Sequence, residues 1–393
     1  MKDVKKVILA PDSFKGTLSA QQVCEIEEKA IKKVWPEAEV VKIPMADGGE
    51  GLVESYLAML GGERRFVKGC GPKPASFAAA SSEFRSAYEE VNAMYGILPD
   101  GSVVMEMAQA AGLPQMGENK DPLKATTYGV GEMLLDAAKS GCSRVLLGIG
   151  GSATDDCGVG MAAALGYRFY DADGAETAPL AENLINIERI AAPSEELTLP
   201  EIFVACDVTN PLLGPDGATY TFSPQKGATE ETLPLLERGM AHYAKVLEAF
   251  CGKEIANLPG AGAAGGLGAM LSGMLNAKLM PGAEMLLESA HFTEEIKDAD
   301  FVVTGEGRID WQSAFGKVPG TIGAHCKQAG IPCIAICGSK GKDAESLLEK
   351  GLTQIHVSCK EAKPFEEIVK TAAEDFTRCC EEIFTPDFSP EKH

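Results

Sequence analysis

The chain has 393 residues, of which 45% are apolar and 6% aromatic, and its formal net charge is −21. This charge argues against binding to nucleic acid or to an anionic membrane surface, because either would need a basic face. The length exceeds that of one ordinary hydrophobic core, so we expect two domains of the α/β class, with three as the alternative.

No apolar run is long enough to span a bilayer, and the N-terminal segment meets Pro11 too early for a secretory signal. We therefore expect a cytoplasmic protein with no membrane partner. The twelve cysteines are scattered and form no Cys-x-x-Cys pair. They are expected to be reduced, mostly buried apolar residues.

The first 60 residues predict strand, loop and helix twice. Residues 6–10 form the first strand, and Ser19 caps a helix that runs to about residue 34. The loop between them contains Lys15 at the end of a strand, where open α/β sheets bind ligands. Lys15 is therefore a candidate substrate-binding cation, with a solvated loop lysine as the alternative.

The second unit predicts a strand at residues 39–43 and a helix that ends near residue 60. Asp47 and Glu50 flank two glycines in the loop between them. An acidic turn is often only a helix cap, which is a fair alternative for Glu50. Asp47 is the better candidate ligand for a metal or a substrate, since the glycines let the backbone approach a ligand beside it.

Residues 64–107 are more β-like, with YGIL and SVVMEM as candidate strands around a Pro-Asp-Gly turn. Residues 73–88, KPASFAAASSEFRSAY, are rich in alanine and serine and predict a surface excursion that is not a site. A helix is expected over residues 123–138. This stretch differs in architecture from the first 60 residues.

Residues 144–160, RVLLGIGGSATDDCGVG, form the most informative stretch. A strand at 145–147 and a helix at 159–165 are joined by glycines and hydroxyl side chains, an arrangement that binds anions such as phosphate. A tight turn that binds nothing is the alternative. Asp155 and Asp156 would repel a phosphate unless a divalent cation lay between them, so Asp156 is a candidate metal ligand.

Two further loops carry candidate residues. A strand at residues 201–206 is followed by Asp207 and Asn210 in a rigid loop, and residues 222–227, FSPQKG, add an amide and a cation. Residues 258–268, LPGAGAAGGLG, show G-x-G-x-x-G spacing, but no strand precedes them, so this dinucleotide fingerprint is weak. A glycine loop that opens a helix at residue 269, and that could cover phosphates, fits better.

The last third returns to regular alternation, with strands at residues 300–304 and 332–337 and helices at residues 320–329 and 365–384. Between residues 306 and 317 lies a mixed-charge cluster at the end of the first of these strands, for which a surface salt-bridge cluster is the alternative. Its members are Glu306, Arg308, Asp310 and Lys317. All five histidines lie outside the candidate loops, which argues against a histidine base.

Several strand-end loops thus present an acid with glycines, and few present a cation. This pattern is typical of magnesium-assisted phosphoryl transfer, in which positioning and charge neutralisation carry most of the catalysis. It does not suit a nucleophile-based hydrolase, because no Gly-x-Ser-x-Gly elbow and no suitably placed histidine are found, and a Walker loop is also absent.

The sequence resembles the bacterial class I glycerate kinases. The shared motifs follow the family's order between residues 10 and 320 and are APDSFKGTLSA, PMADGGEG, TTYGVGE, GIGGSATDDCGVGMAAALG, VACDVTNPLLGPDGA, FSPQKGA, PGAGAAGGLG and TGEGRIDWQSAFGKVPG. The resemblance implies that the γ-phosphate of ATP is transferred to D-glycerate with Mg²⁺, at the 2-hydroxyl, to give 2-phosphoglycerate.

The resemblance also implies two α/β domains with the active site in the cleft between them. One is a Rossmann-like, parallel-sheet domain formed by both chain ends, residues 1–65 and 288–393. The other is an inserted mixed α/β domain, residues 66–287. A homodimer is possible. Alternatives for the function are 3-phosphoglycerate as the product, a kinase of another small hydroxy acid, or a non-catalytic sensor of organic acids and nucleotides.

The chain departs from the family pattern in three places. Asp155, Asp156, Cys157 and Gly158 stand where the family has Asn-Asp-Gly-Gly, so one amide is replaced by a charge. Ser313 replaces a threonine. Residues 73–88 have no counterpart, and substrate choice would be affected if they contacted the cleft.

With this resemblance, the candidate residues take hypothetical roles. Asp207 is the first choice for the base that deprotonates the glycerate hydroxyl, and Asp310 the second. Arg308 binds the glycerate carboxylate, and Lys15 neutralises the transferring phosphate. The nucleotide-binding candidates are Gly150, Gly151, Ser152, Thr154, Asn210, Gly260, Gly262 and Gly265. The metal candidates are Asp47, Asp156 and Glu306.

Overall fold

The structure is a computed structural model of the chain. It describes residues 4–14, 16–46, 48–49, 51–75, 81–195, 197–314, 316–361 and 363–391. Lys15 and Asp47, which the sequence placed in the site, lie outside the described residues, as does Glu50.

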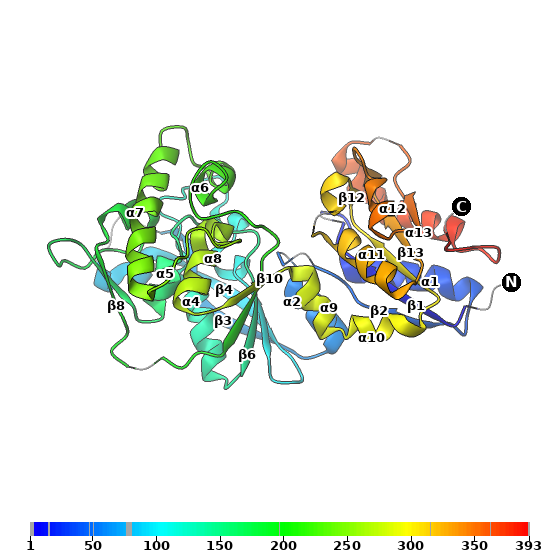
Figure 1. Cartoon of the computed structure of the whole chain (residues 1–393), viewed down its shortest axis with the longest axis horizontal. Helices are drawn as coiled ribbons and strands as arrows, with labels where there is room; N and C mark the ends of the chain where they lie inside the picture. Colours follow the sequence, from blue (N-terminus) through cyan, green and yellow to red (C-terminus); the bar gives the residue numbers. More distant parts are fainter. Residues whose placement is uncertain are drawn as a thin grey trace. The chain divides into compact units, whose positions relative to one another are not determined.

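The chain divides into two compact units (Figure 1). Unit 1 consists of Met1–Asp47, Glu54–Gly61 and Pro281–His393, and unit 2 of Gly48–Val53 and Gly62–Met280. The domain bounds expected from the sequence lie between residues 65 and 66 and between residues 287 and 288. These bounds stay a prediction.

Unit 1 is built on a five-stranded sheet in the order β15-β13-β11-β1-β2, in which all neighbours run parallel. The strands are β1 (Lys6–Pro11), β2 (Glu39–Lys42), β11 (Phe301–Gly305), β13 (Cys333–Cys337) and β15 (Gln354–Val357). β11 and β13 are buried along their whole length. A parallel strand covered on both faces needs this continuous apolar run.

Helices cover both faces of this sheet. α1 (Ala20–Val34) and α13 (Phe365–Ile383) pack on one face through a common apolar core. α11 (Val318–Ala329) lies across β11 and β13 on the other face (Figure 1). The remaining elements of unit 1 are shorter and are α2 (Leu52–Leu60, which begins in unit 2), α9 (Gly282–Ser289), α10 (Phe292–Glu295), α12 (Ser346–Lys350), the 3-10 helices η5 (Ile296–Asp298) and η6 (Trp311–Ala314), β12 (Arg308–Ile309) and β14 (Ser339–Lys340).

Helix α1 begins where the sequence predicted. The backbone N–H of Gln22 donates to Ser19 Oγ, and the backbone N–H of Ser19 donates to Gln22 Oε1, so both members of the capping box are present. Its buried face includes Glu27, whose two carboxylate oxygens have no hydrogen-bond partner among the described residues. A carboxyl group in this position is unusual, because burial without a partner is costly.

Unit 2 is built on a six-stranded mixed sheet in the order β10-β9-β6-β5-β4-β3. β10, β9, β6 and β5 run parallel, whereas β4 is antiparallel to both β5 and β3. The strands are β3 (Glu63–Pro74), β4 (Tyr88–Ile97), β5 (Val103–Glu106), β6 (Arg144–Gly148), β9 (Glu201–Ala205) and β10 (Lys278–Met280).

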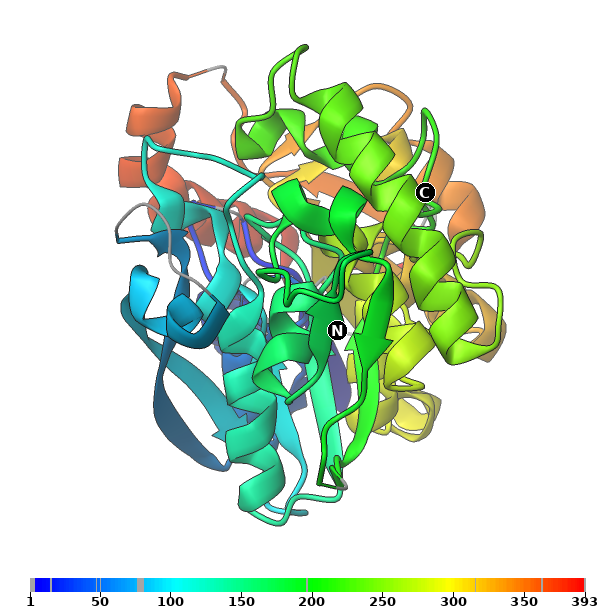
Figure 2. The same cartoon turned by 90° about the vertical axis from the view of Figure 1, so that its left-hand side faces the viewer.

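The helices of unit 2 surround one large apolar core. The longest, α7 (Leu233–Cys251), runs along the surface of the unit (Figure 2). The others are α3 (Ala108–Ala111), α4 (Tyr128–Lys139), α5 (Val159–Ala164), α6 (Ala218–Phe222) and α8 (Ala263–Met274), with the short 3-10 helices η1 (Ser81–Ala87), η2 (Leu113–Met116), η3 (Ala181–Asn186) and η4 (Pro224–Lys226) and the small strands β7 (Arg168–Tyr170) and β8 (Arg189–Ala191).

The fold class predicted from the sequence, α/β with parallel strands, is confirmed. Two local expectations were wrong. The helix expected at residues 123–138 begins only at Tyr128, because the preceding segment forms turns. Residues 73–88 are not simply a surface excursion, since Phe84 and Tyr88 are buried and pair with each other and with Tyr128.

Two expectations about composition can also be compared with the structure. All twelve cysteines are free, eight of them buried and four partly buried, which confirms the prediction that they form no disulfides. Among the described residues, no helix combines the length and the apolar character needed to cross a membrane.

Candidate active site

The glycine-rich stretch after β6 makes an exposed turn at the carboxyl edge of the sheet of unit 2. Gly151 adopts φ = +73°, a conformation that favours glycine. The N–H of Leu113 donates to Gly151 O at 2.9 Å, and Ser152 bridges Gly112, so η2 and the residue before it hold the turn. The strand, turn and helix expected from the sequence are therefore present, with Gly150, Gly151 and Ser152 at the surface.

The loop that begins at Gly48 packs against this turn within unit 2. The N–H of Gly150 donates to Gly48 O at 3.3 Å, and a Cβ atom on Gly150 would lie 2.6 Å from the Cα atom of Gly49. Only glycines allow the two backbones to approach so closely. The motif that contains Asp47 and the glycine-rich motif are thus neighbours, although Asp47 itself lies outside the described residues.

Asp156 lies in the core of unit 2 and binds backbone and hydroxyl donors. Its Oδ2 accepts hydrogen bonds from the N–H and Oγ1 of Thr127, at 2.9 and 2.8 Å, and from the N–H of Gly160 at 3.3 Å. Its Oδ1 accepts from the N–H of Gly158 at 3.1 Å. Burial raises the pKa of Asp156 to about 6, against these hydrogen bonds, which lower it. Three of the four donors reach Oδ2, and one reaches Oδ1.

Asp155 is also fully buried, next to an equally buried lysine. Its Oδ2 accepts a hydrogen bond from Thr219 Oγ1 at 3.3 Å, and its Oδ1 has no hydrogen-bond partner among the described residues. Burial raises the pKa of Asp155, and the positive charge of Lys226 opposes this rise. Burial lowers the pKa of Lys226, and Asp155 opposes that change in turn.

The sequence suggested that Asp155 and Asp156 face a ligand beside the glycine-rich turn. In the structure both side chains are buried and do not face the turn. Both side chains point inward, where residues at the start of α4, α5 and α6 contact them. The cation of the FSPQKG motif likewise points into the core. Asp156 as a magnesium ligand stays a prediction, and it would require some of its four hydrogen bonds to break.

The glycines of the second glycine-rich loop serve close packing. A Cβ atom on Gly265 would lie 2.0 Å from the carbonyl oxygen of Thr154, and one on Gly262 would lie 2.2 Å from that of Pro211. Gly260, Gly262 and Gly265 are buried, and the N–H of Gly262 donates to the carbonyl oxygen of Asn210. Of the nucleotide-binding candidates, Gly150, Gly151, Ser152 and Asn210 are accessible, while Thr154 and these three glycines are not.

Asp207 stands at the same edge of unit 2 as the glycine-rich turn. It is exposed and follows β9, whose last residue, Ala205, pairs with Gly148 at the end of β6. Gly48 lies against Ala205, since a Cβ atom on Gly48 would be 2.8 Å from the Ala205 Cβ atom. One edge of unit 2 thus gathers the Gly48 loop, the glycine-rich turn and an exposed carboxylate.

The mixed-charge cluster of unit 1 follows β11. Glu306 is buried and accepts a hydrogen bond from Ser313 Oγ, and Lys317 Nζ lies 3.9 Å from its Oε2. Asp310 Oδ2 lies 3.9 Å from Arg308 Nε. Ser313, the residue that stands in place of a threonine, keeps the hydroxyl that orders this loop.

Arg308 is the most exposed member of this cluster, with 67% of its side chain accessible. A guanidinium so exposed keeps most of its donors for a planar anion such as a carboxylate. Asp12 was not among the predicted site residues, yet it lies at the end of β1, and its N–H donates to Gly305 O at the end of β11. In the sequence, Asp12 could have been selected by the criterion used for the other candidates, because it directly follows a predicted strand.

No group of three or more histidine, cysteine, aspartate or glutamate side chains in the described part of the chain is arranged to hold a metal ion. This does not argue against magnesium chemistry, because Mg²⁺ is usually bound by one or two carboxylates together with substrate phosphates. Glu306 is a buried carboxylate at a strand end with Lys317 beside it, and its role as a metal ligand stays a prediction.

Comparison with known proteins gives one consistent result. A sequence model described as the Glycerate kinase family matches residues 7–386. A glycerate kinase of Halalkalibacterium halodurans is 44% identical over 88% of each chain, and the glycerate 2-kinase of Escherichia coli K12 is 38% identical over 96% of this chain and 97% of its own. A crystal structure from Salmonella typhimurium LT2, provisionally named glycerate kinase 2, matches with a TM-score of 0.83 and 36% identity over 97% of both chains.

Proposed function

The chain belongs to the glycerate kinase family, and from that premise we propose that it transfers the γ-phosphate of ATP to the 2-hydroxyl of D-glycerate. The products are 2-phosphoglycerate and ADP. The observation that carries this proposal is the edge of unit 2, where an exposed glycine turn at a strand end lies beside an exposed aspartate.

The glycine-rich turn is proposed to bind the phosphates of ATP. Gly150 and Gly151 let the backbone approach an anion, and Ser152 adds a hydroxyl donor at the surface. The buried acids behind the turn do not oppose this binding directly, because Asp156 is surrounded by donors and Asp155 by Thr219 and Lys226.

Asp207 is proposed to accept the proton of the attacking hydroxyl as the oxygen bonds to the γ-phosphorus and the bond to the β-phosphate oxygen breaks. A kinase aspartate within hydrogen-bond reach performs this task without a shifted pKa. Asp310 is the second candidate for this base. Arg308 is proposed to bind the glycerate carboxylate with two parallel N–H groups.

Lys15 and magnesium are proposed to neutralise the negative charge of the phosphoryl group that is transferred. Magnesium bound to the nucleotide phosphates would offset the charge that develops at the transferring phosphoryl group. Glu306 is the described carboxylate proposed to contact it, with Asp47 and Asp156 as the other candidates. The possible homodimer and the cytoplasmic location remain proposals, which sedimentation and cell fractionation would test.

One assay tests the function and separates the alternatives. The protein is incubated with D-glycerate, ATP and Mg²⁺, ADP release is measured, and the product is identified by phosphorus NMR. We expect ADP and 2-phosphoglycerate in equal amounts. A 3-phosphoglycerate signal would move the acceptor to the other hydroxyl. Turnover with other hydroxy acids only would exclude glycerate as the substrate. If no hydroxy acid caused ATP consumption, the non-catalytic sensor of organic acids and nucleotides would be the alternative that fits.

A further inference from the structure

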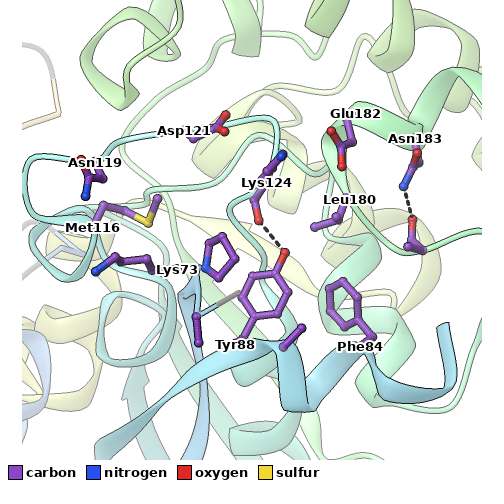
Figure 3. Close-up of a pocket in the computed structure, with 14 residues that line it drawn as sticks. Lys73, Phe84, Tyr88, Met116, Asn119, Asp121, Lys124, Leu180, Glu182 and Asn183 are labelled. Carbon is purple, nitrogen blue, oxygen red and sulfur yellow. Dashed lines mark hydrogen bonds between the residues drawn. The ribbon is translucent and has the colours of Figure 1, made fainter. Parts of the chain in front are cut away.

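Unit 2 contains a pocket of about 540 Å³ that none of the proposed catalytic residues lines (Figure 3). Its walls come from the end of β3, from η1 and the start of β4, from the segment after η2, and from the residues that lead into η3. The volume lies within the range of pockets that hold small molecules. Residues 73–75, Phe84, Ala87 and Tyr88 form part of its wall, and they belong to the segment that the sequence set apart.

One wall of the pocket is aromatic. The rings of Phe84 and Tyr88 lie 4.9 Å apart at an angle of 40°, and Phe84 also contacts Tyr128 at 5.7 Å. The phenol of Tyr88 donates a hydrogen bond of 2.7 Å to the carbonyl oxygen of Lys124 on the opposite wall (Figure 3). Burial raises the pKa of Tyr88, so the phenol stays protonated and can donate this hydrogen bond. A fixed aromatic wall is suited to a flat ring.

The polar groups at the pocket cancel one another in charge. Lys73 and Lys124 carry two positive charges, and Asp121 and Glu182 carry two negative charges. Lys73 is moreover paired with Glu89 at 3.0 Å. An anion such as a free phosphate would meet two carboxylates here, so the lining favours a ligand part without net charge.

The lining also offers both hydrogen-bond donors and acceptors. The side chain of Asn183 donates to Ala178 O at 3.1 Å (Figure 3), and its amide oxygen is a hydrogen-bond acceptor. Carboxylates and the Asn119 amide add further acceptors and donors at the rim. An uncharged flat ring with an amino group and several ring nitrogens matches this set, and adenine is such a ring.

The pocket lies close to the glycine-rich turn within unit 2. Met116, which lines the pocket, ends the same four-residue η2 whose first residue, Leu113, donates to Gly151 O. A 3-10 helix rises about 2 Å per residue, so the two ends of η2 are roughly 6 Å apart. The pocket and the glycine-rich turn thus lie at the two ends of one short 3-10 helix.

We propose that this pocket binds the adenine and ribose of the ATP donor. The inference rests on the proposed function for the identity of the donor, but the pocket itself can be tested by binding alone. Phe84 and Tyr88 then form the base-binding wall, so this part of the segment has a function beyond that of a surface loop.

The test fills the pocket with a large side chain. Ala178 is half-buried and lines the pocket, whereas Ala191, also half-buried, lies on β8 and does not line it. Ala178→Trp is expected to raise the KM for ATP at least tenfold and to leave the KM for D-glycerate within twofold. Ala191→Trp is the matched control and should change neither. Circular dichroism and thermal melting show that both variants are folded.

A binding measurement makes the result independent of turnover. Calorimetry with adenosine should show binding to the unaltered protein and to Ala191→Trp, and at least tenfold weaker binding to Ala178→Trp. Irradiation with 2-azido-ATP should label a peptide from residues 84–124, and an excess of adenosine should prevent the labelling. If Ala178→Trp fails to fold, the labelled peptide decides the question.

The outcomes separate the two proposals. Turnover with an unchanged KM for ATP in folded Ala178→Trp, or a label confined to another part of the chain, would overturn the pocket and leave the kinase function in place. No turnover, together with adenosine binding that Ala178→Trp weakens, would overturn the kinase function and support the pocket. No adenosine binding and no labelling within residues 84–124 would overturn the pocket whatever the turnover.

Discussion

The ammonium group of Lys226 lies in the core of unit 2 and donates a hydrogen bond of 2.6 Å to the carbonyl oxygen of Thr154. This contact joins two sequence motifs that are 72 residues apart. Lys226 thereby holds Thr154, the second residue after the exposed turn at Gly150–Ser152. A residue that resembles a substrate-binding cation in the sequence is thus a positioning residue in the structure.

Lys226→Met should destabilise unit 2, because it leaves the carboxylate of Asp155 buried without its cation. The variant also loses the hydrogen bond from the ammonium group to Thr154 O, and a hydrogen bond from a charged group is typically worth about 1.5–3 kcal/mol. Urea unfolding at neutral pH measures this loss. The double variant Lys226→Met with Asp155→Asn should recover part of it, since no unpaired charge remains. A single variant within about 1 kcal/mol of the unaltered protein would contradict the assignment.

Glu27 should make the stability of unit 1 depend on pH. Burial raises the pKa of Glu27 well above its ordinary value of 4.5, so the folded protein keeps it protonated while the unfolded chain ionises it. Unfolding therefore becomes easier as pH rises above 4.5, by up to about 1.4 kcal/mol per pH unit, until the folded pKa is reached.

Glu27→Gln should remove this slope between pH 5 and pH 7 in denaturant unfolding measured at several pH values. Glu25→Gln on the exposed face of the same helix is the matched control and should keep the slope. Equal pH dependence in the two variants would show that Glu27 is not the group responsible.

Much of the fold follows from local sequence signals. The capping box at Ser19, the buried strand β13 and the amphipathic helix α13 each depend on residues close together in the chain, and all three were predicted. The turn at Gly151 was predicted for the same reason, because glycine is the residue that its φ angle favours.

The direction of side chains beyond the turn was not predictable in this way. Asp155 and Asp156 are buried because Thr127, Thr219 and Lys226, distant in the sequence, fold around them. The pocket beside Tyr88 was missed for a similar reason. An alanine-rich segment has weak local signals, and its buried aromatics acquire their partners only when β4 and the residues near Lys124 meet.

Glu306→Gln should raise the Mg²⁺ concentration required for half-maximal activity severalfold, because a neutral amide binds a hard cation less strongly than a carboxylate does. Magnesium titration at fixed ATP and D-glycerate measures this change. Glu345→Gln, a surface glutamate of unit 1 paired with Lys340, is the control. An unchanged magnesium requirement in folded Glu306→Gln would remove Glu306 from the metal site.

Arg308→Lys should raise the KM for D-glycerate at least tenfold, which corresponds to about 1.4 kcal/mol of lost binding. A lysine keeps the charge but loses the planar pair of N–H groups that match a carboxylate. Steady-state kinetics with varied D-glycerate measure the effect. Arg378→Lys on the surface of the same unit provides the control. If both variants keep the original KM, Arg308 does not bind the carboxylate.

Asp207→Asn should lower kcat by a factor of about 10²–10⁴, the usual contribution of a general base. The amide keeps the size of the side chain but cannot accept the hydroxyl proton, so the KM for D-glycerate should change much less than kcat. Asp216→Asn in the same loop is the matched control, and Asp310→Asn tests the rival base. A loss below tenfold in Asp207→Asn, with a larger loss in Asp310→Asn, would transfer the role to Asp310.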